Sequence, residues 1–184
     1  MRWIRSFPDV LLPNRAYVVD DLPRLITSNY DYTPLGPIDD DVCLIEWDIA
    51  LEPAQVVTFE YGIRKYQYNR PVVAAHRLYH VADQPVWAHR TVDPRNGLER
   101  WIEEGEPFCD YFAFGLIYLP REIVRAFLEA PAPARGTSPW IGNGVYLDER
   151  FTDQTFSVWY RHHYIHTRPV PVLWDVRPVH LHGK

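Results

Sequence analysis

The sequence predicts an α/β domain with a mixed, mainly parallel central sheet flanked by helices. Two observations support this fold class. Hydrophobic runs of strand length alternate along the chain with segments of helical periodicity, and the prolines fall mostly between these segments. Since neither an internal repeat nor a shift in composition marks a boundary, we expect one domain over residues 1–184.

The helices are the elements with the clearest local signals. Pro53 and Pro120 each precede an apolar periodic run, and proline suits the first position of a helix. Phe156 and Tyr160 have the spacing of one helix face. The expected elements, in order, are a strand at 15–20, a short helix near 22–28, a loop at 29–41, a strand at 42–48, a helix at about 53–66, strands at 70–80 and 85–90, a short helix near 97–103, a strand region at 108–119, a helix from Pro120, a loop at 131–144, a helix at about 153–164 and an extended C-terminal segment.

The composition excludes several classes of protein. The chain is 47% hydrophobic and 23% charged, which is enough for a dense core and argues against a disordered chain. A formal net charge of −5 argues against binding to bulk nucleic acid. Apolar runs stay shorter than the roughly 20 residues of a membrane span, and we read no signal peptide, so we expect a cytoplasmic protein. Cys43 and Cys109 lie in apolar surroundings, which favours buried, reduced thiols.

A pair of carboxylates ends the most hydrophobic strand. Glu46 and Asp48, in "VCLIEWD", are two residues apart and so project from the same side of a strand. Two ionised carboxylates this close repel each other, and a divalent cation such as Mg²⁺ or Mn²⁺ relieves that repulsion. Ligands of open α/β sheets bind beyond the carboxyl ends of the strands. The alternative is that one carboxylate caps the following helix and the other is solvated.

These motifs together resemble GT-A-fold glycosyltransferases, whose metal motif "IEWD" matches as the E-x-D variant. "YFAFGLIYLPREIVRAF" (111–127) is similar to their acceptor segment, "RFTDQTFSVWYRHH" (150–163) to their acidic helix start, and "VRPVHLH" (176–182) to their terminal strand with a metal-binding histidine. The order of the motifs agrees with the family. Residues 42–184 would form the metal and acceptor half, and residues 1–41 an abbreviated donor-binding half.

The resemblance implies a role for each matching residue. Glu46 and Asp48, with His180 or His182, would hold Mn²⁺ or Mg²⁺ against the diphosphate of a nucleotide-sugar donor. Asp153 would be the general base toward a hydroxyl acceptor, although it also suits a helix cap. The terminal histidines have the alternative of a solvated tail. Further expected donor-binding residues are Asp20, Asp21 and Trp140.

Three functions follow from these readings. The first is a metal-dependent glycosyltransferase, in which a partner subunit of a homo-oligomer is one way to complete the short donor half. The second is a non-catalytic carbohydrate-binding or interaction protein on a degenerate core of this fold. The third is a metal hydrolase that uses the terminal His-x-His, with no role for Glu46. Convergence of Glu46, Asp48 and a terminal histidine distinguishes the first from the others.

Overall fold

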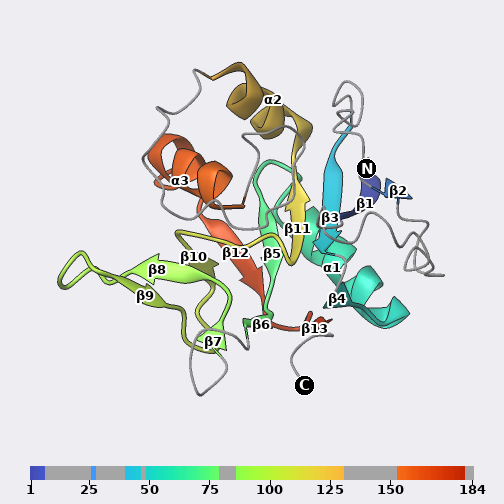
Figure 1. The fold of residues 1–184 in the computed structure, drawn as a ribbon, viewed down its shortest axis with the longest axis horizontal. Coiled ribbons are helices and arrows are strands. Elements are labelled where there is room, and N and C mark those ends of the chain that lie inside the picture. The colour runs from blue at the N-terminus through green and yellow to red at the C-terminus, as the bar shows by residue number, and fades with distance from the viewer. Residues whose placement is uncertain (7–25, 28–39, 47–48, 79–85, 131–152, 181–184) are drawn as a thin grey trace, which may run out of the picture.

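A mixed seven-stranded sheet forms the centre of the molecule. The computed structural model describes residues 1–6, 26–27, 40–46, 49–78, 86–130 and 153–180. The strand order of the sheet is β10-β12-β5-β11-β3-β1-β2 (Figure 1). Its strands are β1 (Arg2–Ser6), β2 (Ile26–Thr27), β3 (Val42–Glu46), β5 (Val72–Ala74), β10 (Phe108–Cys109), β11 (Leu116–Leu119) and β12 (Val170–Leu173).

The sheet is evenly mixed, whereas the sequence predicted a parallel majority. Strand β1 runs parallel to both β2 and β3, and β5 runs parallel to β12. Strand β11 is antiparallel to both β3 and β5, and β10 is antiparallel to β12. The reason lies in the connection from β5 to β11. A return to parallel direction requires a crossover, and the described part of residues 75–115 contains no helix, so β11 runs back from the edge at which β5 ends.

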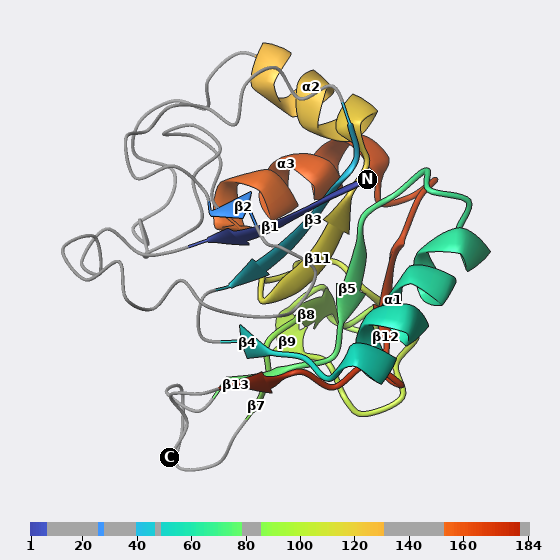
Figure 2. The ribbon, with the colours of Figure 1, turned by 90° about the vertical axis from the view of Figure 1, so that its right-hand side faces the viewer.

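In the part of the chain that the structure describes, three helices cover the two faces of the sheet (Figure 2). Helix α1 (Pro53–Lys65) packs Phe59 and Ile63 on the face formed by Cys43, Ile45 and Val72. Helices α2 (Arg121–Glu129) and α3 (Asp153–Tyr164) pack on the other face. The buried residues that they contribute there are Ile123, Val124, Phe127, Phe156 and Tyr160. Successive residues of β3 point to opposite faces of the sheet, and helices cover both faces. The side chains of its first four residues are therefore buried, which explains why this run is continuously apolar.

Outside the central sheet, the described residues form three short antiparallel pairs. They are β4 (Ile49–Ala50) with β13 (Val179–His180), β6 (Arg77–Leu78) with β7 (Val86–Trp87), and β8 (Arg90–Val92) with β9 (Glu99–Trp101). The prediction of a short helix near 97–103 is wrong, because strand β9 lies there. Gly97 has a φ of 72°, which reverses the chain between β8 and β9.

The N-terminal region differs from the expectation where the structure describes it. Strand β1 was not predicted, and Ile26–Thr27 form β2 rather than part of a helix at 22–28. The strand expected at 15–20 lies outside the described residues.

Cys43 and Cys109 are buried free thiols, as predicted, and burial raises the pKa of each. Within the described ranges, the helices are too short or too polar to cross a bilayer.

Candidate functional site

The carboxyl end of β3 lies where the strand order of the sheet changes direction. Strand β2 lies on one side of β1, and β3, the next strand of the sheet in the sequence, lies on the other side of β1. The strand order therefore reverses at β1. The two parallel strands end side by side, with Ser6 opposite Glu46. In open α/β sheets such a switch point, outside the carboxyl ends of the strands, is where ligands bind. Glu46 therefore occupies the position that this sheet offers to a ligand.

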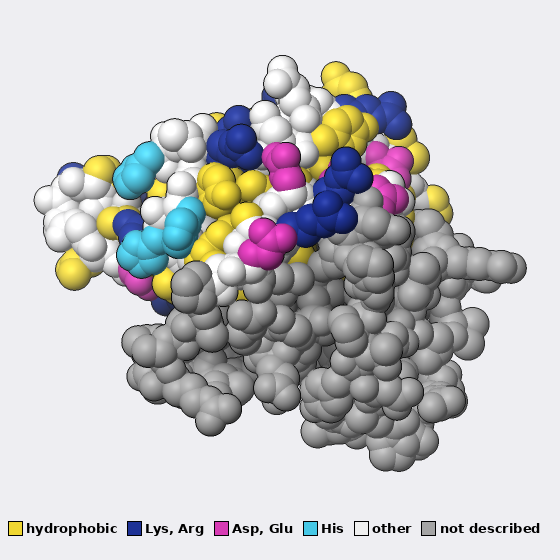
Figure 3. Space-filling view, turned by 90° about the horizontal axis from the view of Figure 1, so that it is seen from above, with side chains coloured by type: hydrophobic (Ala, Val, Ile, Leu, Met, Phe, Trp, Pro, Cys, Tyr) yellow, Lys and Arg dark blue, Asp and Glu magenta, His cyan; other side chains and the backbone are white. Residues whose placement is uncertain are grey.

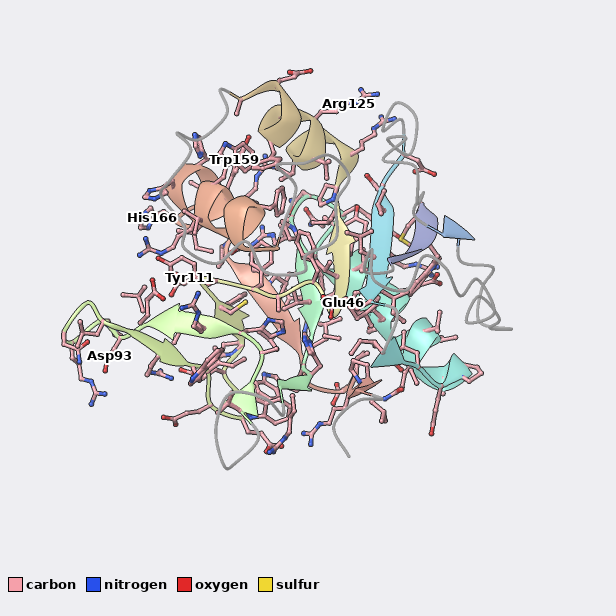
Figure 4. All side chains as sticks on the ribbon, in the orientation of Figure 1. Glu46, Asp93, Tyr111, Arg125, Trp159 and His166 are labelled. Atoms are coloured by element: carbon pink, nitrogen blue, oxygen red, sulfur yellow. The ribbon has the colours of Figure 1, made fainter. Side chains whose placement is uncertain are left out.

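Glu46 is held at this edge by Gly115, the residue that precedes β11. Its side chain is half-buried, and its backbone N–H donates to the carbonyl oxygen of Gly115 at 2.9 Å. When the register of β3 and β11 is extended by one residue beyond Ile45 and Leu116, Gly115 is the cross-strand partner of Glu46. Alternation along β3 directs Glu46 to the same face as Leu44, the face covered by α2 and α3. Figure 4 labels Glu46 at the end of β3.

The ring of His76 occupies the place where Gly115 has no side chain. A Cβ added to Gly115 would lie 2.5 Å from Nε2 of His76 and 2.8 Å from its Nδ1. His76 is only 2% exposed, and it follows β5 at the same edge of the sheet. Directly opposed residues of an antiparallel pair have Cβ positions about 5 Å apart. The imidazole of His76 therefore lies over the cross-strand neighbour of Glu46, at a position that only glycine fits.

A second buried histidine supports the first. His89 packs edge-on against His76, with ring centroids 5.1 Å apart. The Nε2 of His89 lies 2.9 Å from the carbonyl oxygen of Ala74, and its Nδ1 accepts from the N–H of Ala113 at 3.3 Å. These partners assign a neutral ring protonated on Nε2. Burial lowers the pKa of His89 from 6.5 to about 4. His89 is thus a structural support, and His76 is the histidine whose ring lies against Gly115.

Sequence reasoning did not select His76. The relation of His76 to Gly115 depends on strand pairing, which no local pattern gives. The available signal was local: His76 directly follows the apolar run "PVVAA", which leaves a polar ring at the carboxyl end of a buried strand.

The structure describes part of the predicted metal set. Strands β13 and β4 pair antiparallel, with His180 opposite Ile49, the residue that follows Asp48 in the sequence. Asp48 and His182 lie outside the described residues, and of His180 only the backbone is described. Among the residues that the structure describes, three or more potential metal-ligating side chains do not converge. The joint role of Glu46, Asp48 and the terminal histidines stays a prediction.

The other predicted site residues are mostly outside the description. Asp20, Asp21 and Trp140 lie in segments that the structure does not describe. Helix α3 begins at Asp153, where the sequence predicted a helix start, but the side chain of Asp153 is not described. Its role as a base or as a cap therefore also stays a prediction.

Two further sets of polar side chains have structural explanations. Asp110 accepts a hydrogen bond from the Thr91 hydroxyl at 2.8 Å and another from the N–H of Val92 at 2.7 Å, so the residue that follows β10 is tied to the second half of β8. His162 and His166 are exposed, one in the last turn of α3 and one just beyond it. Figure 3 shows exposed histidines on this face of the molecule, close to basic side chains.

Comparison with known proteins gives a limited result. No protein family and no curated protein matches the chain. Among solved structures, the chain is similar to one described as A197 from STIV, with 12% identity, a TM-score of 0.47 and coverage of 98% of this chain and 85% of that one. It is also similar to apo-UDP-glucose pyrophosphorylase, with 11% identity, a TM-score of 0.45 and coverage of 94% and 73%. Likeness of this degree assigns no function, and the class defined here is an α/β protein with a mixed sheet.

Proposed function

We propose that the protein is a metal-dependent glycosyltransferase of GT-A type, which moves a sugar from a nucleotide-sugar donor to a hydroxyl acceptor. The donor diphosphate would bind at the carboxyl ends of β1 and β3, and the acceptor would approach from the side of β11 and α3. The proposal combines the motif order of the sequence with the position of Glu46 at the switch point of the sheet.

The pairing of β13 with β4 is the observation that carries the proposal. The C-terminal strand returns across the molecule so that the backbone of His180 lies opposite Ile49. Ile49 follows the E-x-D motif directly. A terminal histidine strand on the far side of the sheet would have excluded a shared metal set. The observed register supports a shared metal set, because the backbone of His180 lies opposite that of Ile49, the residue after Asp48.

The chemistry of the proposed ligand set fits the metal. Glu46 and Asp48 offer hard carboxylate oxygens, and His180 or His182 offers an imidazole nitrogen, which together suit Mn²⁺ or Mg²⁺. When bound, the ion would offset the negative charge of the departing nucleoside diphosphate. Glu46 would bind the ion through a carboxylate whose backbone is fixed to Gly115. His76, seated against Gly115, would restrict the directions in which that carboxylate can turn.

Asp153 would take the proton from the acceptor hydroxyl if the reaction inverts the anomeric centre. It begins α3, whose buried residues Phe156 and Tyr160 anchor the helix on the same sheet face as Glu46. That anchoring supports a fixed distance between the helix start and the end of β3. The acceptor oxygen would then bond to the anomeric carbon as the bond from that carbon to the nucleoside diphosphate breaks, and Asp153 would hold the proton.

Titration calorimetry tests the proposal. The protein is titrated with Mn²⁺ and then with UDP, GDP, ADP and CDP, as wild type and as Glu46→Gln, Asp48→Asn and the control Glu129→Gln. Glu129 is an exposed carboxylate on α2, away from β3. We expect Mn²⁺-dependent binding of one nucleoside diphosphate that weakens at least about tenfold in the first two variants, the loss expected for a charged ligand group.

The controls decide among the three functions. Unchanged affinity in Glu129→Gln shows that the loss is local. Wild-type protein that binds no nucleotide in the presence of Mn²⁺ would refute the transferase and favour a non-catalytic protein. Metal binding that survives Glu46→Gln intact would favour a site made by the terminal histidines alone.

A further inference from the structure

Arg77 follows strand β5 at the edge of the sheet at which Glu46 ends β3. Arg77 directly follows His76, whose ring touches the position of Gly115, the cross-strand partner of Glu46. Strands β3 and β5 are separated by β11 alone, which corresponds to about 10 Å between their axes. Arg77 thus lies on the side of Glu46 opposite to β1, at the edge where the proposed donor would bind.

The guanidinium of Arg77 is fixed on an aromatic platform. Its Cζ lies 4.3 Å from the centre of the Trp87 ring, and Arg77 and Trp87 are directly opposed in the β6–β7 pair. Trp87 in turn packs edge-on against Trp174, with ring centroids 4.8 Å apart. The indole N–H of Trp174 donates to the carbonyl oxygen of Glu106 at 2.6 Å. This chain of contacts orders the arginine before any ligand arrives.

A second arginine, Arg177, contacts the same ring but, unlike Arg77, is engaged by other groups. Arg177 lies 6.0 Å from the same Trp87 ring, but its Nη2 is paired with Glu104 at 2.7 Å. Its Nε also donates to the carbonyl oxygen of Trp174 at 2.9 Å. Among the residues that the structure describes, Arg77 has only its contact with Trp87 and makes no ion pair. One of the two positive charges is therefore compensated and the other is not.

We propose that Arg77, held on Trp87, binds a phosphoryl group of a substrate in the site at the end of β3. A planar guanidinium presents paired N–H donors that match phosphate oxygens, and stacking on an aromatic ring leaves those donors free at its rim. This inference rests on the proposed function for its substrate context. The phosphoryl group belongs either to the donor diphosphate or to the acceptor, which share the same recognition chemistry.

The test uses inorganic phosphate without metal. Wild-type protein in EDTA is titrated with inorganic phosphate while ¹H–¹⁵N spectra record the Arg77 Nε–H and the Trp87 indole N–H. We expect both signals to shift and saturate, and the affinity to fall about tenfold in Arg77→Gln, as for a charge-assisted hydrogen bond. Arg77→Lys keeps the charge but not the fork, so it should bind with an intermediate affinity.

Arg177→Gln is the matched control, because it removes the same charge from beside the same ring. Its phosphate affinity should stay within about twofold of wild type, since its guanidinium is already engaged by Glu104. Equal affinity in wild type and Arg77→Gln, or an unshifted Arg77 signal at saturation, would overturn the inference.

A second titration identifies the source of the phosphoryl group and separates this inference from the proposed function. UDP and Mn²⁺ are added to wild type and to Arg77→Gln. Weaker UDP binding in the variant assigns Arg77 to the donor diphosphate, and unchanged UDP binding with lost phosphate binding assigns it to the acceptor. Because the phosphate titration contains no metal, it should succeed in Glu46→Gln even if Mn²⁺-dependent nucleotide binding is absent.

Discussion

Substitution of Gly115 by alanine tests the contact on which the candidate site is built. The added Cβ would lie 2.5 Å from Nε2 and 2.8 Å from Nδ1 of His76, closer than real Cβ atoms approach other atoms. His76 is 2% exposed, so its ring cannot move into solvent without leaving a cavity. Overpacking of this kind costs about 1–3 kcal/mol. The loss of unfolded-state entropy on changing glycine to alanine returns about 0.4–1 kcal/mol. We therefore expect a net destabilisation of about 1–2 kcal/mol.

The assay is urea denaturation followed by tryptophan fluorescence, with Gly62→Ala as the matched control. A Cβ on Gly62 would meet the methyl groups of Leu173, which form the end of a flexible side chain. Alanine is also favoured over glycine by about 1 kcal/mol in a helix interior. Gly62→Ala should therefore change the free energy of unfolding much less than Gly115→Ala does, or raise it.

A double variant provides the refutation. The His76→Ala substitution removes the ring and so makes room for the methyl group that Gly115→Ala adds. The loss of stability in the double variant should therefore be smaller, by about 1–2 kcal/mol, than the sum of the losses in the two single variants. Strict additivity, or a Gly115→Ala protein within about 0.5 kcal/mol of wild type, would show that the His76 ring is not fixed over Gly115. The positioning role of His76 beside Glu46 would then be lost.

The remaining predictions concern buried polar groups. Tyr118→Phe removes a hydrogen bond of 2.8 Å to Asp41 and should lower the free energy of unfolding by about 1–2 kcal/mol in urea denaturation; an unchanged midpoint would contradict this. The folded pKa of His89 is about 4, below its ordinary value of 6.5, so the unfolded state takes up the proton first and stability falls with falling pH. Between about pH 7 and pH 5 the loss attributable to this group should be about 2 kcal/mol, and His89→Asn should reduce that slope. Asp110→Ala should destabilise the fold by about 1–3 kcal/mol through the lost bond to Thr91, yet leave Mn²⁺ and nucleotide titrations unchanged; a specific loss of binding would make Asp110 a site residue.

Local signals predicted the elements that depend on local chemistry. The continuous apolar run of Val42–Glu46 predicted a buried strand, and its first four residues are at most 3% exposed. Helix α3 lies at the predicted residues, and α1 ends within one residue of the prediction. Each of these depends on hydrophobic periodicity and on a proline or an acidic residue at the helix start, which act within one or two turns of the chain.

The elements that were missed depend on distant partners. Strand β1 has no strong pattern of its own and is a strand because β3 pairs with it along its whole length. Glu99–Trp101 form β9 because the turn at Gly97 brings them against β8, although the local sequence suggested a helix. Propensity is a weak guide where strand pairing decides the conformation.

The sequence by itself determined the α/β class, the burial of β3, two helix boundaries and the position of Glu46 at a strand end. Only the tertiary structure decided the strand order, the antiparallel entry of β11, the return of β13 to β4, and the seating of His76 against Gly115. The physical reason is that hydrophobic periodicity and capping act between neighbours in the chain. Strand order and side-chain juxtaposition arise from hydrogen bonds and packing between residues as far apart as Ile49 and His180, whose pairing no local pattern encodes.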